Sequence, residues 1–333
     1  EMLALVTYGN LSPVRKLLVN VGKTLNLSRA IITALDLSAA LRQGGIGILA
    51  HPSLFFKGLM PMLKSFRSEA NAHKIQAEIK GRANAQLYRK SGLFIAEQNT
   101  TDLSKMEEVY MSAWAEKTPF VAGSGRAYVM FLNKLRADMF DMLYATLPAG
   151  QKHTQKEIDA ISNYINVATG RGVIGSKGAL RLKERSQAGE NLAVIFFAPK
   201  YVASRFNFLF GQPFYGSPPA VKKIIAKEYA RYFAGVTAVI SLAAMAAAAF
   251  KDDDDEREFI GLDPRSSNFL KVRFGDTRID LLSGLIQPFV FMTRIVSGQT
   301  TTGSGNVKAL RNWWVLPSDE VDRYAGVGYG AKN

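Results

Sequence analysis

The longest uncharged stretch of this chain runs from Tyr232 to Phe250, 19 residues without an acidic or basic side chain. Basic residues precede it, and a largely acidic run at 252–258 follows it. Because a helix rises about 1.5 Å per residue, a helix of this length is roughly as long as a bilayer core is thick. The stretch therefore has to be covered either by lipid or by other protein elements.

The composition of this stretch leaves three ways to cover it. Eight of its 19 residues are Ala, and Leu and Ile occur once each, which is weakly hydrophobic for an isolated membrane span. A buried core helix, a helix of a membrane-embedded bundle or oligomeric pore, and an inter-subunit helix of a soluble assembly all fit an Ala-rich sequence. The candidate membrane-facing or subunit-packing positions are Tyr232, Gly235, Val239, Leu242, Ala246 and Phe250.

The net charge of the 333-residue chain is +14, from 42 basic and 28 acidic residues. Such an excess favours an anionic partner: nucleic acid, phospholipid headgroups or an acidic protein. The hydrophobic fraction of 47% is too low for a protein with many membrane spans. The absence of cysteine excludes disulfides, zinc-thiolate sites and cysteine nucleophiles.

The N-terminal residues show no signal-peptide pattern, because they lack a basic segment and a small-residue cleavage site. The chain also begins with Glu1 rather than Met. We expect it to be the ordered part of a longer polypeptide, and a processed or trimmed chain is the alternative.

Hydrophobic spacing predicts helices over most of the chain. Residues 126–147 carry an apolar stripe, and a capping box of Thr154 and Glu157 opens a helix at 155–168. A long helix at 219–250 is predicted to begin with Ser217 as its cap. Three further helices are predicted at 36–42, ending at Gly44-Gly45, at 53–90, with Pro61 as a start or kink, and at 103–116, capped by Asp102.

The residues after the acidic run change character. Residues 270–280 predict a β-hairpin with a two-residue turn at Gly275-Asp276. Asp280 is a candidate cap for a helix at 281–296, bent at Pro288. The composition of residues 298–306, rich in Gly, Ser and Thr, indicates a flexible linker.

These elements predict a mainly α protein, an extended multi-helix assembly with long helices and a small β-hairpin near the C-terminus. We divide it into three regions. Residues 1–120 form an N-terminal helical region, and residues 121–250 form a central helical region with a basic, glycine-rich loop and the long apolar helix. Residues 251–333 form a third region with the hairpin, a helix and a flexible tail.

Two basic segments are candidates for phosphate contact. They indicate nonspecific electrostatic contact with DNA and nothing more specific. Aromatic side chains, on which the bases of a single strand would stack, are absent from the first segment and few in the second. A basic, solvated surface without such a role is the alternative. The candidate residues are Arg171, Lys177, Arg181, Lys183 and Arg185 in the first segment and Lys222, Lys223 and Lys227 in the second.

The sequence carries no constellation typical of catalysis. Residues 170–177 are close to a P-loop, but Ser176 precedes Lys177, the reverse of the order that phosphate and magnesium binding need. His51, His73 and His153 lack the spacing of a helical metal-binding pair. We expect no catalytic, cofactor-binding or metal site, and an enzyme that acts through sparse residues is the alternative.

Five segments together resemble the large polyvalent proteins and the internal virion, or ejection, proteins of bacteriophages. The most distinctive is DPRSSNFLKVRFGDTRID at 263–280, although NFLK stands at 268–271 where the resemblance leads us to expect DFGK. The resemblance extends from Asp36 to Gly298. The other segments are DLSAALRQGG at 36–45, RAYVMFLNKLRADMF at 126–140, NVATGRG at 166–172 and FFAPKYVASRF at 196–206.

This resemblance implies a non-enzymatic virion protein that is stored in the capsid or tail, ejected with the genome and reassembled in the host cell envelope. There it would form or brace an oligomeric conduit for DNA. The implied partners are further copies of the chain, other virion or tail proteins, DNA through nonspecific contacts and the host membrane. A soluble helical scaffold or nucleic-acid-associated module of a large injected phage protein is the alternative.

Overall fold

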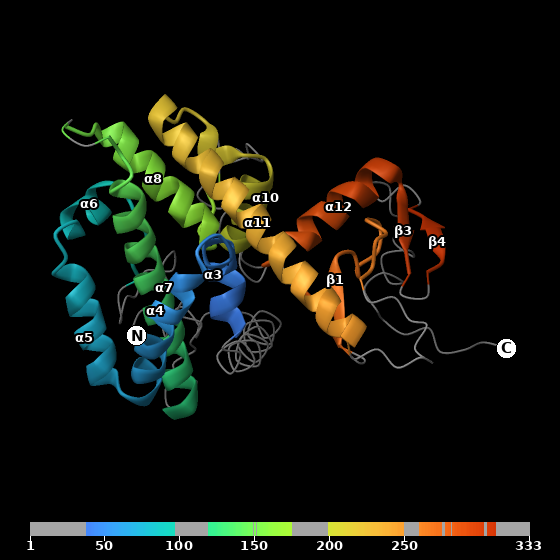
Figure 1. Cartoon of the computed structure of the whole chain (residues 1–333), viewed down its shortest axis with the longest axis horizontal. Helices are drawn as coiled ribbons and strands as arrows, with labels where there is room; N and C mark the ends of the chain where they lie inside the picture. The colour runs from blue at the N-terminus through green and yellow to red at the C-terminus, as the bar shows by residue number, and fades with distance from the viewer. Residues whose placement is uncertain are drawn as a thin grey trace, which may run out of the picture. The chain divides into compact units, whose positions relative to one another are not determined.

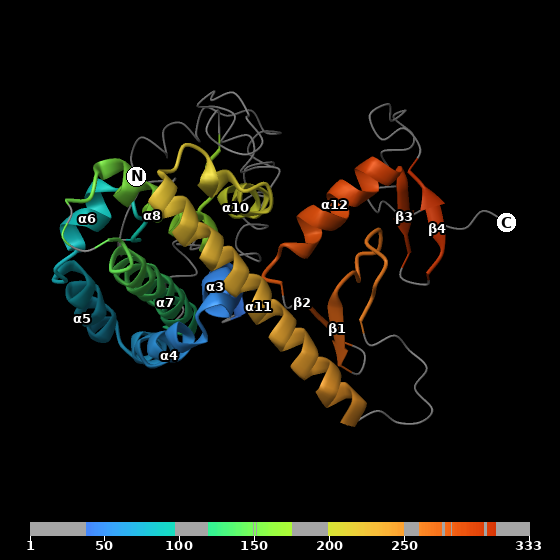
Figure 2. The same cartoon turned by 45° about the horizontal axis from the view of Figure 1, so that its top comes forward.

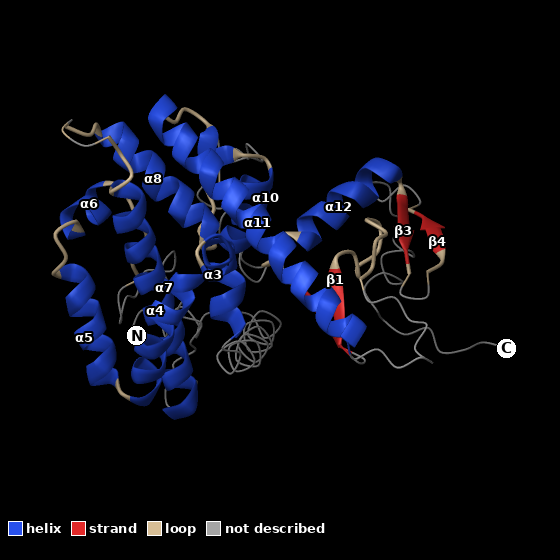
Figure 3. Ribbon diagram, viewed as in Figure 1, coloured by secondary structure: helices blue, strands red, loops and turns tan. Residues whose placement is uncertain are grey.

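The computed structural model describes residues 38–96, 119–148, 150, 152–174, 199–249, 260–274, 277–280, 282–302 and 305–310. The chain divides into two units, Glu1–Val239 and Ile240–Asn333, and the division falls within one long helix, α11 (Pro219–Ala249). The described residues are mainly helical with short strands in the second unit, which confirms the predicted fold class (Figure 1, Figure 3).

Among the described residues, the first unit contains helices and one 3-10 turn before α11. They are α3 (Ser38–Ala50), α4 (Pro52–Arg67), α5 (Glu69–Lys80), α6 (Ala85–Lys90), α7 (Pro119–Tyr144), α8 (Gln155–Ala168), α10 (Pro199–Leu209) and the 3-10 turn η1 (Gln212–Phe214). The predicted N-terminal and central regions share this unit, because α7 packs against α3, α4 and α5 as well as α8.

Helix α7 supplies the centre of the first unit's core, with Phe131, Leu135 and Met139 almost fully buried. Helix α3 packs across α7 with glycines at the contact. It continues to Ala50, so the predicted end at Gly44-Gly45 was wrong. A Cβ on Gly44 would lie 2.7 Å from Leu135 Cδ2. These glycines therefore allow close helix packing instead of ending the helix, a tertiary effect that local propensity does not contain.

The predicted single helix at 53–90 is in fact three helices. The backbone of Ser68 is extended (φ −150°, ψ 131°), which ends the hydrogen-bond ladder of α4 before α5 begins. Pro61 lies inside α4 and does not start it. Figure 2 shows α5 beside α7, and Arg82, in the turn after α5, pairs with Asp138 (2.8 Å) and Asp141 (3.1 Å) of α7.

The predicted capping box opens α8 as expected. Thr154 Oγ1 accepts a hydrogen bond from the backbone N–H of Glu157, whose carboxylate accepts one from the backbone N–H of Thr154. Helix α11 begins at Pro219 as predicted, but Ser217 does not cap it, because its hydroxyl donates to the carbonyl of Pro213 (2.7 Å).

The second unit contains the predicted hairpin. Strands β1 (Lys271–Phe274) and β2 (Thr277–Asp280) pair antiparallel, and the pairing of Phe274 with Thr277 leaves the predicted two residues for the turn. Asp280 does not cap the next helix, since its carboxylate accepts from the backbone N–H of Leu282 (2.8 Å) and α12 (Ile286–Ser297) begins later.

The prediction that residues 298–306 form a flexible linker was wrong for the part of this segment that the structure describes. Strand β3 (Gln299–Thr301) pairs antiparallel with β4 (Val307–Ala309), so this segment belongs to a second small hairpin.

Pro288 lies in the first turn of α12, where a proline removes no helical hydrogen bond and therefore need not bend the helix. The predicted helix at 103–116, the acidic run and the C-terminal tail lie outside the described residues.

Candidate functional site

Helix α11 presents one buried and one exposed face in its first five turns. The buried face is held to the first unit by Gly235, where a Cβ would overlap the carbonyl oxygen of Leu49 at the end of α3. Tyr229 adds a stacked contact with Phe208 of α10 (ring centroids 4.1 Å apart) and donates its hydroxyl to the carbonyl of Phe208 (2.8 Å). The other buried residues of this face are Val221, Ile225, Glu228, Tyr232 and Val236.

The exposed face begins with the lysines that the sequence marked as phosphate contacts. Lys222, Lys223 and Lys227 are all exposed, and none of their side chains bonds to another described residue. Lys223 and Lys227 are four residues apart, so like charges lie next to each other on the helix surface and repel. This surface is electrostatically suited to an anion.

A buried carboxylate fixes this part of α11 to the rest of the unit. Glu228 is fully buried, and its Oε2 lies 2.6 Å from Nε2 of His51, between α3 and α4. Its Oε1 accepts from the half-exposed guanidinium of Arg231 (2.5 Å). A buried carboxylate is stable only with such partners. Sequence reasoning missed this site, because nothing in the spacing of His51 and Glu228 links them.

The uncharged stretch is covered over only part of its length. Tyr232 and Val236 are buried and Val239 is half-buried, whereas Leu242 and Met245 are 65% and 69% exposed. The side chain of Ala246, together with Phe250, lies outside the description. Within the described part of the chain, no helix combines the length and the apolar character that crossing a membrane requires.

The basic loop is described only at its start, and there the prediction was wrong. Arg171 is 7% exposed, and its guanidinium lies 3.7 Å from the ring centroid of Phe94. The buried guanidinium of Arg136 lies 5.0 Å from the same centroid and donates to the side chain and carbonyl of Thr169 (2.8 and 2.9 Å). Arg171 therefore belongs to the core, and the candidates Lys177, Arg181, Lys183 and Arg185 lie outside the described residues.

Two asparagines hold the segment that carries Phe94. Asn133 Oδ1 accepts from the backbone N–H of Ala96 (2.8 Å), and its Nδ2 donates to the Ala96 carbonyl (2.7 Å). Asn166 does the same for the N–H of Phe94 (2.9 Å) and the carbonyl of Gly92 (2.8 Å). These side chains satisfy backbone groups that have no strand partner, and the two groups of Ala96 are buried.

Four of the segments that carry the phage resemblance meet in this polar core. Asn133 and Arg136 belong to 126–140 and Asn166 to 166–172. Arg205, from 196–206, is buried and donates to the carbonyl of Arg42 (2.7 Å), in 36–45. The polar residues named here therefore stabilise the fold of the first unit.

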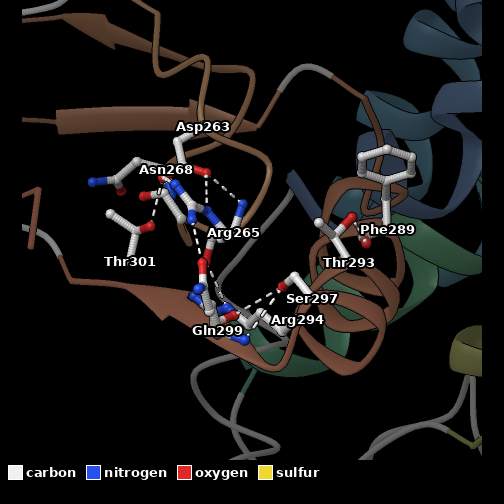
Figure 4. Close-up of polar contacts among 10 residues, drawn as sticks. Asp263, Arg265, Asn268, Phe289, Thr293, Arg294, Ser297, Gln299 and Thr301 are labelled. Atoms are coloured by element: carbon white, nitrogen blue, oxygen red, sulfur yellow. Dashed lines mark hydrogen bonds and ion pairs between the residues drawn. The ribbon is translucent and has the colours of Figure 1, made fainter. Parts of the chain in front are cut away.

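The fifth segment forms a hydrogen-bonded cluster in the second unit (Figure 4). Asp263 accepts from the backbone N–H of Arg265 (2.9 Å), from its guanidinium (3.0 and 3.2 Å) and from the hydroxyl of Thr301 (2.5 Å). Arg265 also donates to Gln299 (2.6 Å), and its carbonyl accepts from Arg294 (2.7 Å). The Arg265 guanidinium and the Thr301 hydroxyl hold the pKa of the Asp263 carboxyl well below its usual range.

Other chemistry is sparse among the described residues. They contain no group of three or more acidic, His or Cys side chains that could hold a metal ion. An open pocket of about 170 Å³ beside α5 and α6 includes Ile79, Arg89 and Tyr88. Burial, together with a hydrogen bond to Asp141 (2.6 Å), raises the pKa of Tyr88 above its usual range, so the phenol stays protonated.

Comparisons of the chain with protein-family models, with characterised proteins and with solved structures found no match. The candidate functional site is therefore defined by geometry alone. It is the exposed face of α11, which is basic at Lys222, Lys223 and Lys227 in the first unit. Leu242 and Met245, in the part of α11 that belongs to the second unit, are exposed and apolar.

Proposed function

We propose that this chain is a non-enzymatic helical part of a phage virion protein that is ejected with the genome and forms or braces an oligomeric conduit for DNA across the host envelope. The observation that carries the proposal is the exposed face of α11, which continues from unpaired lysines into exposed apolar side chains. The phage assignment itself rests on the resemblance of the five sequence segments.

The basic half of this face supports contact with DNA. Lysines without an acidic partner can neutralise DNA phosphates and release the cations condensed on the DNA, and this release drives nonspecific binding. Arg231 is less suited to this role because its guanidinium already pairs with Glu228. Contact through Lys222, Lys223 and Lys227 would place DNA along the first turns of α11.

The apolar half supports assembly with other chains. Large exposed apolar side chains that adjoin one another on a helix mark a surface that another element covers. Leu242 and Met245 are three residues apart and therefore neighbours on α11. We propose a second copy of this chain as the partner, with other virion or tail proteins and the host membrane as further partners of the assembly.

The second candidate function is a soluble helical scaffold or nucleic-acid-associated module of a large injected protein. It is favoured by Tyr232, Gly235 and Val236, which are packed into the first unit as in an ordinary core helix. It expects the whole apolar stretch to be buried in a monomer. The exposure of Leu242 and Met245 favours the conduit proposal over this alternative.

The proposal is tested with purified full chain, a DNA duplex and liposomes of anionic lipid. We expect self-association, DNA binding that is lost when Lys222, Lys223 and Lys227 are changed to Gln, and cosedimentation with liposomes. The control removes three exposed charges elsewhere on the first unit: Lys74→Gln, Arg89→Gln and Lys90→Gln. A chain that stays monomeric and binds neither DNA nor liposomes contradicts the conduit proposal, whereas a DNA-binding monomer supports the alternative.

A further inference from the structure

Helix α4 presents apolar side chains on both its inward and its outward face. The inward face buries Leu54 and Met62, and a Cβ on Gly58, between them, would lie 2.8 Å from the ring of Phe131 in α7. Because this contact is so close, α4 cannot turn about its axis to bury its other face. In Figure 2, α4 lies along the lower edge of the first unit, below α7.

The outward face of α4 carries a stripe of large apolar side chains. Phe56, Met60 and Leu63 are 69%, 57% and 42% exposed. Spacings of four and three residues make them neighbours on one side of the helix, opposite the face that buries Leu54 and Met62. The outward face of a helix in a soluble unit normally carries polar residues. Adjoining exposed apolar side chains of this size mark a surface that something else covers.

Every charged side chain of α4 is basic. Lys57 and Lys64 are seven residues apart and therefore lie along the same edge of the stripe, and Arg67 lies at its C-terminal end. All three are exposed. The next acidic residue along the chain, Glu69, opens α5 and lies 3.6 Å from Nε2 of His73. The stripe is therefore bordered by positive charge, and α4 adds no negative charge to it.

We propose that the outward face of α4 is a lipid-docking surface that lies in the headgroup region of an anionic bilayer without crossing it. Phe56, Met60 and Leu63 enter the boundary between headgroups and acyl chains, as the apolar face of an interfacial helix does. Lys57 and Lys64 keep their ammonium groups at the level of the lipid phosphates, because their long apolar stems can lie along the stripe.

The chemistry of the stripe favours lipid over a protein partner. A second copy of α4 would bring the same basic edge and no acidic side chain to the contact, so the positive charges would repel. Pro61 removes a hydrogen bond from the middle of α4, which disfavours the long, straight contact that a partner helix needs. A fluid lipid surface needs no straight contact, and its phosphates supply the negative charge.

This inference goes beyond the proposed function, which assigns no surface to membrane contact, and it does not depend on the phage resemblance. The first test measures partition of the full chain onto vesicles of phosphatidylglycerol and phosphatidylcholine. Phe56→Ser with Met60→Ser should weaken partition about tenfold or more, because two large side chains no longer leave water. Lys57→Gln with Lys64→Gln should weaken it by a similar factor, and should leave binding to pure phosphatidylcholine vesicles unchanged.

The controls remove matched groups elsewhere on the first unit. Phe233→Ser removes an exposed aromatic ring, and Lys74→Gln with Lys90→Gln removes two exposed charges. Both should partition as the wild type does. Since all these changes are at exposed positions, melting followed by circular dichroism should match the wild type. Equal partition of the stripe variants and the controls overturns the proposal.

A second readout reports whether α4 itself enters the interface. Because the chain contains no cysteine, Met60→Cys gives a single attachment point for a polarity-sensitive fluorophore. We expect its emission to rise and to shift to shorter wavelength on anionic vesicles. The same fluorophore at Lys74→Cys, on α5, should remain in water. A label at position 60 that does not respond on vesicle-bound protein contradicts the assignment of α4.

The outcomes separate lipid from a second copy of the chain as the occupant of the stripe. Sedimentation velocity without vesicles should show the same self-association for the wild type and for Phe56→Ser with Met60→Ser. If that variant keeps vesicle binding but loses self-association, the stripe is a contact between copies and the lipid proposal is wrong.

The outcomes also separate this proposal from the function of α11. The stripe variants should keep the DNA affinity of the wild type, since Lys222, Lys223 and Lys227 are unchanged. Full vesicle binding by the stripe variants, with DNA binding lost only in the α11 lysine variant, overturns the lipid surface and leaves the function of α11 intact. Loss of vesicle binding in the stripe variants of a chain that binds no DNA supports the lipid surface and contradicts the DNA contact.

Discussion

Gly235 of α11 lies so close to Leu49 of α3 that a single added carbon would overlap the Leu49 carbonyl oxygen. The neighbour is backbone, which cannot turn aside as a side chain can. This crossing positions the basic part of the exposed face, because Lys222, Lys223 and Lys227 belong to the same helix within the first unit. The site therefore depends on a glycine that looks like a defect in a helical sequence.

The first prediction concerns this contact. In a helix interior, Gly→Ala normally stabilises by about 1 kcal/mol. Gly235→Ala should instead destabilise the chain by about 1–3 kcal/mol through overpacking. Urea unfolding followed by circular dichroism measures the difference. Ala234→Ser, on the exposed face of the same helix, should change stability by less than about 0.5 kcal/mol. Equal or greater stability of Gly235→Ala would show that α11 does not cross α3 here.

The second prediction concerns the buried amide of Asn133. Asn133→Leu keeps the side-chain size but leaves the N–H and carbonyl of Ala96 without their partners. Two unsatisfied buried groups should lower the free energy of unfolding by roughly 2–4 kcal/mol. Hydrogen exchange should show a large loss of protection at the Ala96 amide, whereas Asn71→Ala, at a weakly bonded surface site, should leave it unchanged. Retained protection in Asn133→Leu would contradict this assignment.

The third prediction concerns pH and Asp263. Arg265 and Thr301 bond the ionised carboxylate and lower its pKa below the unfolded value of about 3.9. The stability that these bonds provide is therefore complete above about pH 4 and decreases as the pH falls further. Asp263→Asn should be less stable than the wild type at pH 7 and should lose less stability between about pH 4 and pH 2.

Thr301→Val provides an independent check on this cluster. It removes one hydrogen bond to the carboxylate and should raise the pKa of Asp263 toward its usual value, which NMR titration of the carboxyl carbon measures. An Asp263 that titrates near pH 4 in the wild type would contradict the hydrogen-bonded cluster in Figure 4.

Structural features that depend on residues close together in the chain could be predicted from the sequence. The capping box of Thr154 and Glu157 and the hairpin at 270–280 were predicted correctly, because hydrogen bonds between near neighbours determine both. The predicted helix end at Gly44-Gly45 was wrong, since Gly44 lies against Leu135 of α7, about ninety positions away in the chain. Residues 298–306 were misassigned because Gly, Ser and Thr also suit a tight hairpin.

The basic part of the candidate site was predicted from the sequence, because it depends on the local pattern of one helix. Exposed lysines at Lys222, Lys223 and Lys227 follow from a helical pattern with one apolar face. Arg171 carried the same charge signal but is buried against Phe94, a residue from a distant segment. Charge in a sequence indicates an anion site only where the fold leaves that charge at the surface.

The fourth prediction concerns assembly through the apolar half of α11. Changing Leu242 and Met245 to Ser should shift the chain from oligomer to monomer, because it removes the two exposed apolar side chains that we assign to the partner contact. Sedimentation velocity over a range of concentrations measures this. Met60→Ser, at an exposed apolar position of α4, is the control and should self-associate as the wild type does. Identical behaviour of both variants would remove α11 from the interface.

The central claim, that the basic face of α11 binds DNA phosphates, is tested most directly by the salt dependence of DNA binding. Fluorescence anisotropy with a labelled duplex gives log K against log salt concentration for the wild type and for the Lys222, Lys223 and Lys227 to Gln variant. Loss of three phosphate contacts should reduce the slope by about 2.7. The matched Lys74, Arg89 and Lys90 to Gln variant should keep the wild-type slope. Equal slopes and affinities for the two triple variants would contradict the account.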